Sequence, residues 1–167
     1  MDIRERYNVE ESKGSLVIYP HKPAVRLAWQ VIVCILPAAV VLFFLRHLVG
    51  KVVWASLYVI MVYGILYSLY EIYIRASISY RFCKTTNAVY KSSCFVKEKK
   101  ILTLDELVIF TSSETGTWHY AMGAQKSQFI KNYAISEHFS GGKKSEKRLD
   151  EYENEILEKI NRMVMRS

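Results

Sequence analysis

Cysteine is scarce in this chain, with three residues among 167. A disulfide-dense secreted domain is therefore excluded, because such domains carry many cysteines in an even number. Charged residues are missing from two stretches of 19 residues each, Leu27–Leu45 and Val52–Tyr70. These stretches exclude a fully soluble enzyme. A hydrophobic content of 51% excludes a disordered chain.

Recognisable catalytic and metal-binding motifs are also missing. The stretch Ser140–Ser145 lacks both the earlier glycine and the hydroxyl residue after the first lysine that a phosphate-binding loop requires, so it is interpreted as a flexible linker. The four histidines have no cysteine or carboxylate partner at metal-ligand spacing, which favours surface or interface positions. No Gly-x-Ser-x-Gly nucleophile motif occurs. We therefore expect no catalytic residues, no metal and no cofactor. A lipid-acting membrane enzyme using His119 or Glu71 remains the enzymatic alternative.

The two charge-free stretches have the length of membrane-spanning helices. At ~1.5 Å per residue each measures roughly 28 Å, close to the ~30 Å hydrocarbon core of a bilayer. Buried core helices of a soluble domain are the alternative, but the roughly 90 residues left over are too few to cover both. A cleaved signal peptide is not expected, because the first stretch starts late and no small-residue cleavage site follows it.

The connection between the stretches is short and predicts an antiparallel hairpin. Only six residues, 46–51, join them, so both chain ends lie on one side of the membrane. Lysine and arginine number 5 before the first helix, 2 in the connection and 16 after the second helix. The positive-inside rule therefore places both ends in the cytoplasm. Cys83 and Cys94 are expected to be near neighbours across a strand hairpin, as free thiols in that reducing compartment or as a disulfide if the orientation is reversed.

After the membrane segment the sequence pattern becomes that of strands. Apolar and polar residues alternate in Ile78–Cys83, and turn-forming residues follow at Thr85–Asn87. Further strands are predicted at Ala88–Phe95, Ile101–Leu104, Leu107–Phe110, Trp118–Met122 and Gln128–Ile135, with turns at Lys97–Lys100 and Ser112–Thr117. Regular spacing of about 10 residues favours an antiparallel meander or barrel.

The two ends of the chain complete this picture. Leu149, Tyr152, Ile156, Ile160 and Met163 recur at helical spacing, which predicts an amphipathic helix of roughly 20 residues with Ser145 as its N-cap. Near the start, Ser15–Tyr19 forms one short strand that is able to join the later sheet, with the hairpin inserted between them. The predicted fold class is a membrane α+β protein divided into an N-terminal segment (1–26), a transmembrane hairpin (27–77) and a β domain with a C-terminal helix (78–167).

This layout resembles small bacterial membrane proteins that carry a pleckstrin-homology-like domain, the YcxB-like group. The resemblance is carried by the short strand, the hairpin, the final helix and a diffuse pattern over Tyr80–Phe82, Thr86–Asn87, Val89–Tyr90 and Ile101–Leu107. It implies a barrel of bent antiparallel strands closed by the C-terminal helix, in the bacterial inner membrane. It brings no catalytic residues.

Two groups of residues are candidate contact sites. Near-surface cations attract anionic lipid headgroups, so two basic clusters on turns are candidate membrane-surface contacts, with plain solvated loops as the alternative. They are Lys97, Lys99 and Lys100, and Lys143, Lys144, Lys147 and Arg148. Tyr63, Tyr67 and Tyr70 share one helical face, which predicts packing within the hairpin or against another membrane protein or a second copy.

Nucleic acid is not an expected partner, because the basic surplus is modest and aromatic residues are not interleaved with the lysines. The sequence thus predicts a non-enzymatic inner-membrane protein whose hairpin anchors a cytoplasmic binding or assembly domain. An immunity-type membrane protein that protects against a toxin or effector is the alternative function.

Overall fold

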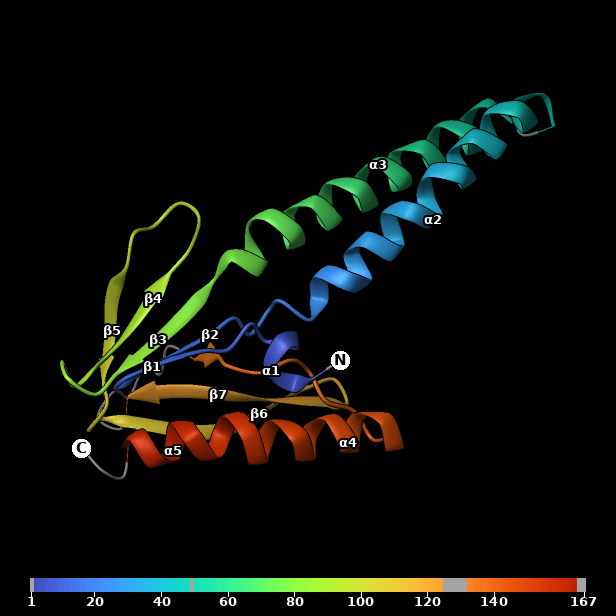
Figure 1. The fold of residues 1–167 in the computed structure, drawn as a ribbon. Coiled ribbons are helices and arrows are strands. Elements are labelled where there is room, and N and C mark those ends of the chain that lie inside the picture. Colours follow the sequence, from blue (N-terminus) through green and yellow to red (C-terminus); the bar gives the residue numbers. More distant parts are fainter. Residues whose placement is uncertain (1, 49, 125–131, 165–167) are drawn as a thin grey trace.

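The fold is an α+β arrangement in which a long helical hairpin projects from a small two-sheet domain (Figure 1). It is known from a computed structural model that describes residues 2–48, 50–124 and 132–164. The hairpin consists of α2 (Ala24–Phe44) and α3 (Lys51–Tyr73), which begin and end within a few residues of the predicted stretches. Both helices are long and apolar enough to cross a membrane.

The first sheet has five antiparallel strands in the order β1-β2-β3-β4-β5. These strands are β1 (Glu10–Ser12), β2 (Ser15–Ile18), β3 (Ser79–Cys83), β4 (Ala88–Ser92) and β5 (Lys99–Thr103). β2 pairs with β3 from Ser15↔Cys83 to Ile18↔Tyr80, so the hairpin is inserted between two adjacent strands of one sheet, as the sequence allowed. The short helix α1 (Ile3–Arg6) and β1 were not predicted, because segments this short show no periodicity.

Strand β4 is shorter than predicted. It ends at Ser92 instead of Phe95, and the residues up to Glu98 form a loop before β5. The predicted turn at Lys97–Lys100 is wrong in its second half, since Lys99 and Lys100 are already in β5. The predicted turn at Thr85–Asn87 is confirmed by Asn87, whose φ of 48° is the left-handed conformation that asparagine tolerates.

The second sheet has three antiparallel strands, β6 (Leu107–Glu114), β7 (Thr117–Ala124) and β8 (Tyr133–Ala134). β6 and β7 are longer than predicted. The turn expected over Ser112–Thr117 contains only Thr115 and Gly116, which both have positive φ. Of the strand predicted at Gln128–Ile135, residues 128–131 lie outside the described residues.

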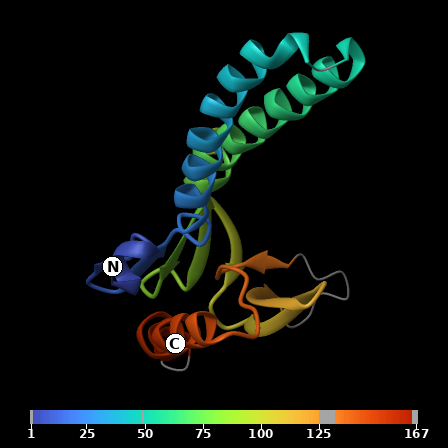
Figure 2. The same cartoon turned by 90° about the vertical axis from the view of Figure 1, so that its right-hand side faces the viewer.

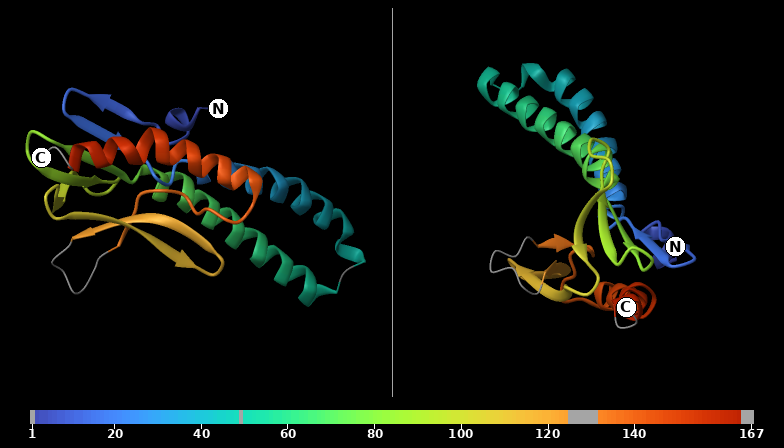
Figure 3. Two further views of the ribbon diagram at one scale, coloured as in Figure 1. Left: turned by 90° about the horizontal axis from the view of Figure 1, so that it is seen from below. Right: turned by 90° about the vertical axis from the view of Figure 1, so that its left-hand side faces the viewer.

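A C-terminal helix closes the domain, as predicted. It runs as α4 (Lys143–Tyr152), one π-helical turn (Glu153–Leu157) and α5 (Glu158–Val164). Figures 2 and 3 show it lying across the space between the two sheets, with α1 beside it. Ser145 is not its N-cap. The helix begins after Gly142, and the buried Ser145 hydroxyl accepts a hydrogen bond from the Ser140 N–H at 2.9 Å.

The core lies between the two sheets and this helix. Both sheets contribute buried apolar residues, including Leu16, Phe82 and Met122, and the predicted helical stripe supplies Tyr152, Ile156 and Ile160, all fully buried. Most large apolar side chains of the hairpin, in contrast, are exposed. The domain therefore has a complete core without using the hairpin's apolar surface.

The expected proximity of two cysteines is wrong. Cys83 pairs with Ala88 at one end of the β3–β4 ladder, whereas Cys94 follows β4 at the other end. The ladder between them spans about 14 Å at ~3.4 Å per residue, too far for a disulfide without backbone movement. All three cysteines are free thiols.

Candidate functional site

The polar residues that cluster most closely lie where the hairpin meets the domain. Five residues separate the end of β2 from the start of α2, and five residues separate the end of α3 from the start of β3. Because β2 and β3 are hydrogen-bonded neighbours, these short connections fix both helices on one sheet. We call residues 19–28 together with residues 67–78 the hairpin base.

At the domain end of α3 and in the 3-10 turn that follows it (Arg75–Ser77), three polar side chains form a ladder with a spacing of four residues. The Glu71 Oε1 atom accepts hydrogen bonds from the Tyr67 hydroxyl at 3.0 Å and from Arg75 Nη1 at 2.7 Å. Glu71 is only 8% exposed, and its Oε2 atom has no partner among the described residues. This carboxylate is thus held at the domain end of an otherwise apolar helix by a guanidinium and a phenol.

A second cluster comes from segments far apart in the sequence. Glu137 Oε2 lies 2.7 Å from Arg6 Nη2 and 3.4 Å from Arg148 Nη1. Its backbone N–H donates to the Tyr7 hydroxyl at 3.0 Å. One half-buried carboxylate therefore ties α1 and α4 to the segment that follows β8.

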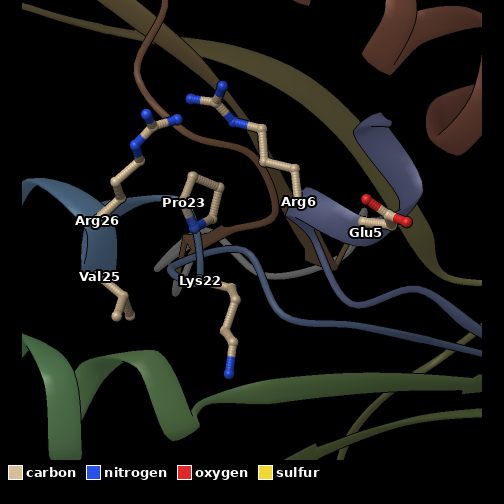
Figure 4. A pocket seen from close by; sticks show the side chains of 6 residues that line it. All are labelled: Glu5, Arg6, Lys22, Pro23, Val25 and Arg26. Carbon is tan, nitrogen blue, oxygen red and sulfur yellow. The ribbon is translucent and has the colours of Figure 1, made fainter. Parts of the chain in front are cut away.

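Both clusters line one cavity of about 300 Å³, which His21 also lines. A groove of about 270 Å³ continues from Glu71 and Arg75 between the two helices, where Tyr63 and Tyr67 line it. A third hollow, of about 250 Å³, is lined by Arg6, Pro23 and Arg26. Figure 4 shows the guanidinium groups of Arg6 and Arg26 on the same side of Pro23, with the Lys22 ammonium pointing away from them.

The imidazole of His21 is held neutral at the hairpin base. Burial, together with the charge of Arg75, lowers its pKa to about 4, and the opposing effect of Glu71 is smaller. In the unfolded chain a histidine titrates near ~6.5. Protonation therefore favours the unfolded state between these two values, and the folded state loses stability as the pH falls through this window.

We expect this linkage to be measurable. On going from pH 7.5 to pH 5, His21 should cost the folded state about 1–2 kcal/mol, after allowance for solvent screening of a partly exposed group. The measurement compares thermal unfolding of the native chain and of a His21→Gln variant at both pH values in the same detergent. A native chain that loses no more stability than the variant would contradict the expectation.

The tyrosine face is present, but it does not pack inside the hairpin. Tyr63, Tyr67 and Tyr70 lie along one side of α3 with ring centroids 6.3 and 6.5 Å apart, and each remains about half exposed or more. A direct contact between the two helices occurs elsewhere, where the Tyr58 hydroxyl on α3 donates a hydrogen bond to the Ala39 carbonyl on α2 at 2.9 Å. The three tyrosines are thus exposed and available for contacts outside the helix pair.

The predicted basic clusters do not form one surface. Lys97 is in the β4–β5 loop, whereas α4 begins well apart from that loop, on the side of the domain below the start of α2 (Figure 1). Lys143, Lys144, Lys147 and Arg148 belong to α4 itself, so the prediction that they form a turn is wrong. Arg148 pairs with Glu137, and Lys147 lies 3.9 Å from Glu151.

Sequence reasoning missed several residues that the fold brings together. Arg6 and Glu137 are 131 positions apart, and no local periodicity links them. His119 and His138 have ring centroids 4.6 Å apart because the Trp118↔Phe139 bridge aligns their segments. The sequence predicted surface or interface positions for the histidines, and the surface alternative is wrong for His119, which is buried.

The chemistry of the hairpin base is that of paired charges. Within the described residues, no three histidine, cysteine or acidic side chains gather as a metal site would require.

Comparison with models of protein families, with curated proteins and with solved structures finds no match to this chain.

Proposed function

We propose that this chain is a non-enzymatic protein of the bacterial inner membrane. In this proposal the hairpin crosses the bilayer twice, and both chain ends are cytoplasmic. The two-sheet part is a pleckstrin-homology-like domain that serves as a binding or assembly module.

The observation that carries this proposal is the exposed apolar surface of the hairpin. Side chains on both helices are largely exposed along their whole length, among them Leu27, Val33, Val40 and Phe44 on α2 and Val52, Val59, Ile60 and Leu66 on α3. Apolar surface left in water costs roughly 25 cal/mol per Å². Because the domain core is complete without these residues, a bilayer is the environment that best explains them.

The architecture supports a domain held in a fixed orientation to the membrane. The hairpin enters and leaves through two paired strands, β2 and β3, and not through a flexible linker. Two antiparallel sheets with a helix across their opening also agree with the pleckstrin-homology-like layout. Lys22, Arg26 and Arg75 at the hairpin base favour its placement on the cytoplasmic side.

The binding role is tested by photo-crosslinking in native membranes. A benzophenone-bearing residue replaces Tyr63, and the same residue replaces Val41 on α2 as the control. We expect a discrete protein adduct from position 63, either a second copy or another membrane protein, and no such adduct from position 41. Adducts with lipid alone at both positions would argue against an assembly role for this face.

A further inference from the structure

We propose a phospholipid-binding site at the end of the first sheet that adjoins the hairpin base. Lys91 and Lys99 bind the lipid phosphate, and Phe95 and Val96 at the tip of the β4–β5 loop insert between the lipid chains. The site rests on the proposed function, because its ligand comes from the bilayer that surrounds the hairpin.

The first observation is a pair of like charges that face each other across two strands. Lys91 on β4 is the register partner of Lys99 on β5, so both side chains lie on the same face of the sheet. Like charges placed directly opposite each other destabilise a sheet. Neither lysine has an ion-pair partner among the described residues, because the nearby Glu98 is engaged with Arg81 at 2.6 Å. An anion between the two ammonium groups would remove this repulsion.

The second observation is a cavity of about 360 Å³ beside these lysines. Ser92 and Ser93 are among the residues that line it, and Ile74, Ile78 and Val96 supply apolar side chains. The Lys91 ammonium lies over the Tyr133 ring, 5.6 Å from its centroid, which directs it toward the second sheet. Two cations next to apolar side chains match a phosphodiester and the first carbons of its lipid.

The position of the cavity also fits a headgroup. Ile74 directly follows the last residue of α3, so the cavity lies at the level where the helix leaves the bilayer in the proposed arrangement. Lys91 also lies close enough to contribute to the electrostatic field at His21 in the hairpin base. A soluble phosphate would not need this position, whereas a lipid phosphate would.

The third observation is the loop that rises from this sheet toward the hairpin (Figure 1). The Cys94 N–H donates to Ser77 Oγ at 3.0 Å, and that hydroxyl donates to the Ile74 carbonyl at 2.7 Å, so the loop is attached to the end of α3. At its tip Phe95 is 78% exposed and Val96 is 52% exposed. An exposed phenylalanine and valine followed by Lys97 are typical of a segment that enters a membrane interface.

Insertion of the loop is tested with spin labels in lipid nanodiscs. The three native cysteines are replaced by serine, and single cysteines are placed by Phe95→Cys, by Ile60→Cys on α3 and by Val108→Cys on β6. We expect the labels at 60 and 95 to collide with oxygen and to be shielded from a water-soluble nickel chelate, with the reverse at 108. A label at 95 that is as open to nickel as that at 108, while 60 is shielded, would overturn the loop insertion alone. A label at 60 open to nickel would instead overturn the proposed membrane span.

The phosphate ligands are tested with a matched pair of charge variants. Lys91→Gln with Lys99→Gln removes the cross-strand pair, and Lys143→Gln with Lys147→Gln removes the same charge from α4. We expect the first variant to bind phosphatidylglycerol in mixed micelles about tenfold or more weakly, since each near-surface lysine contributes to headgroup attraction, and the second to bind within about twofold of the native chain. Equal losses in the two variants would overturn the site.

A competition experiment separates lipid from free phosphate. Inorganic phosphate at a concentration equal to that of the lipid should leave phosphatidylglycerol bound, because it cannot use Phe95 and Val96. Displacement of the lipid by an equal concentration of inorganic phosphate would show a site for a soluble anion and overturn the assignment to a membrane lipid.

Discussion

Replacing Tyr152 by alanine is expected to destabilise the two-sheet domain by about 3–5 kcal/mol, a large fraction of the stability of a small domain. Tyr152 is fully buried on α4. Its ring lies 5.1 Å from that of Tyr7, 5.8 Å from that of Tyr120 and 6.0 Å from that of Phe139, centroid to centroid. One side chain thus joins the N-terminal segment, the second sheet and the C-terminal helix, and its removal opens a cavity that all three border.

The hydroxyl of Tyr152 has a separate role. It donates to the Ile135 carbonyl at 2.8 Å, and burial raises its pKa, so the group stays neutral and the hydrogen bond persists. The matched variant Tyr152→Phe keeps the ring and loses this hydrogen bond, which should cost only about 1–2 kcal/mol. Hydrogen exchange of β7 and α5 amides in nanodiscs measures both losses. An alanine variant no less stable than the phenylalanine variant would show that the ring contacts do not hold the domain together.

Introducing two lysines in the middle of the hairpin is expected to strongly reduce the integration of the chain into the membrane. Val33 is 63% exposed and Ile60 is 66% exposed, and in a bilayer both would face lipid. A lysine near the centre of a membrane helix costs about 2.5–3.5 kcal/mol on insertion scales, so Val33→Lys with Ile60→Lys should strongly reduce the membrane-integrated fraction. The fraction of chain that resists alkaline extraction from membranes measures this effect.

The same substitutions distinguish a membrane hairpin from a soluble one. Exposed positions on a soluble helix accept lysine with little cost, usually within about 0.5 kcal/mol. A variant with Val108→Lys on β6 carries the same residue outside the hairpin and should remain fully integrated. If the double lysine variant also stays integrated, the apolar surface of α2 and α3 is not in contact with lipid.

The parts of the fold with local signals were predicted from the sequence. A run of nineteen charge-free residues identifies each hairpin helix, and the alternation of apolar and polar residues identifies β3. Both patterns lie in consecutive residues and so can be recognised without knowledge of the tertiary structure. The length of β6 and β7 was missed, since Ser112, Ser113 and Glu114 are polar and their strand conformation depends on pairing with Thr117–His119. The intrinsic conformational preferences of serine and glutamate alone predict a turn at these positions.

The hairpin base illustrates what local patterns do not contain. From the sequence, Glu71 was named only in the alternative of a lipid-acting enzyme, although its ladder with Tyr67 and Arg75 follows a four-residue spacing that the sequence does show. The Glu137 cluster has no such signal, because Arg6 and Arg148 reach it only after α1 and α4 pack on the same core. The Lys91↔Lys99 pair likewise depends on a strand register that a bulge near Tyr90 shifts by one residue.

The proposed topology is tested most directly by determining on which side of the membrane residues 50 and 141 lie. Gly50 precedes α3 in the hairpin connection and Gly141 precedes α4 in the domain, and a side chain added at either position meets no atom within 4 Å. In a background with all native cysteines replaced, Gly50→Cys and Gly141→Cys are treated on intact spheroplasts with a membrane-impermeant maleimide. We predict that residue 50 is labelled at once and residue 141 only after lysis. Labelling of both residues from the same side would contradict a hairpin that spans the bilayer.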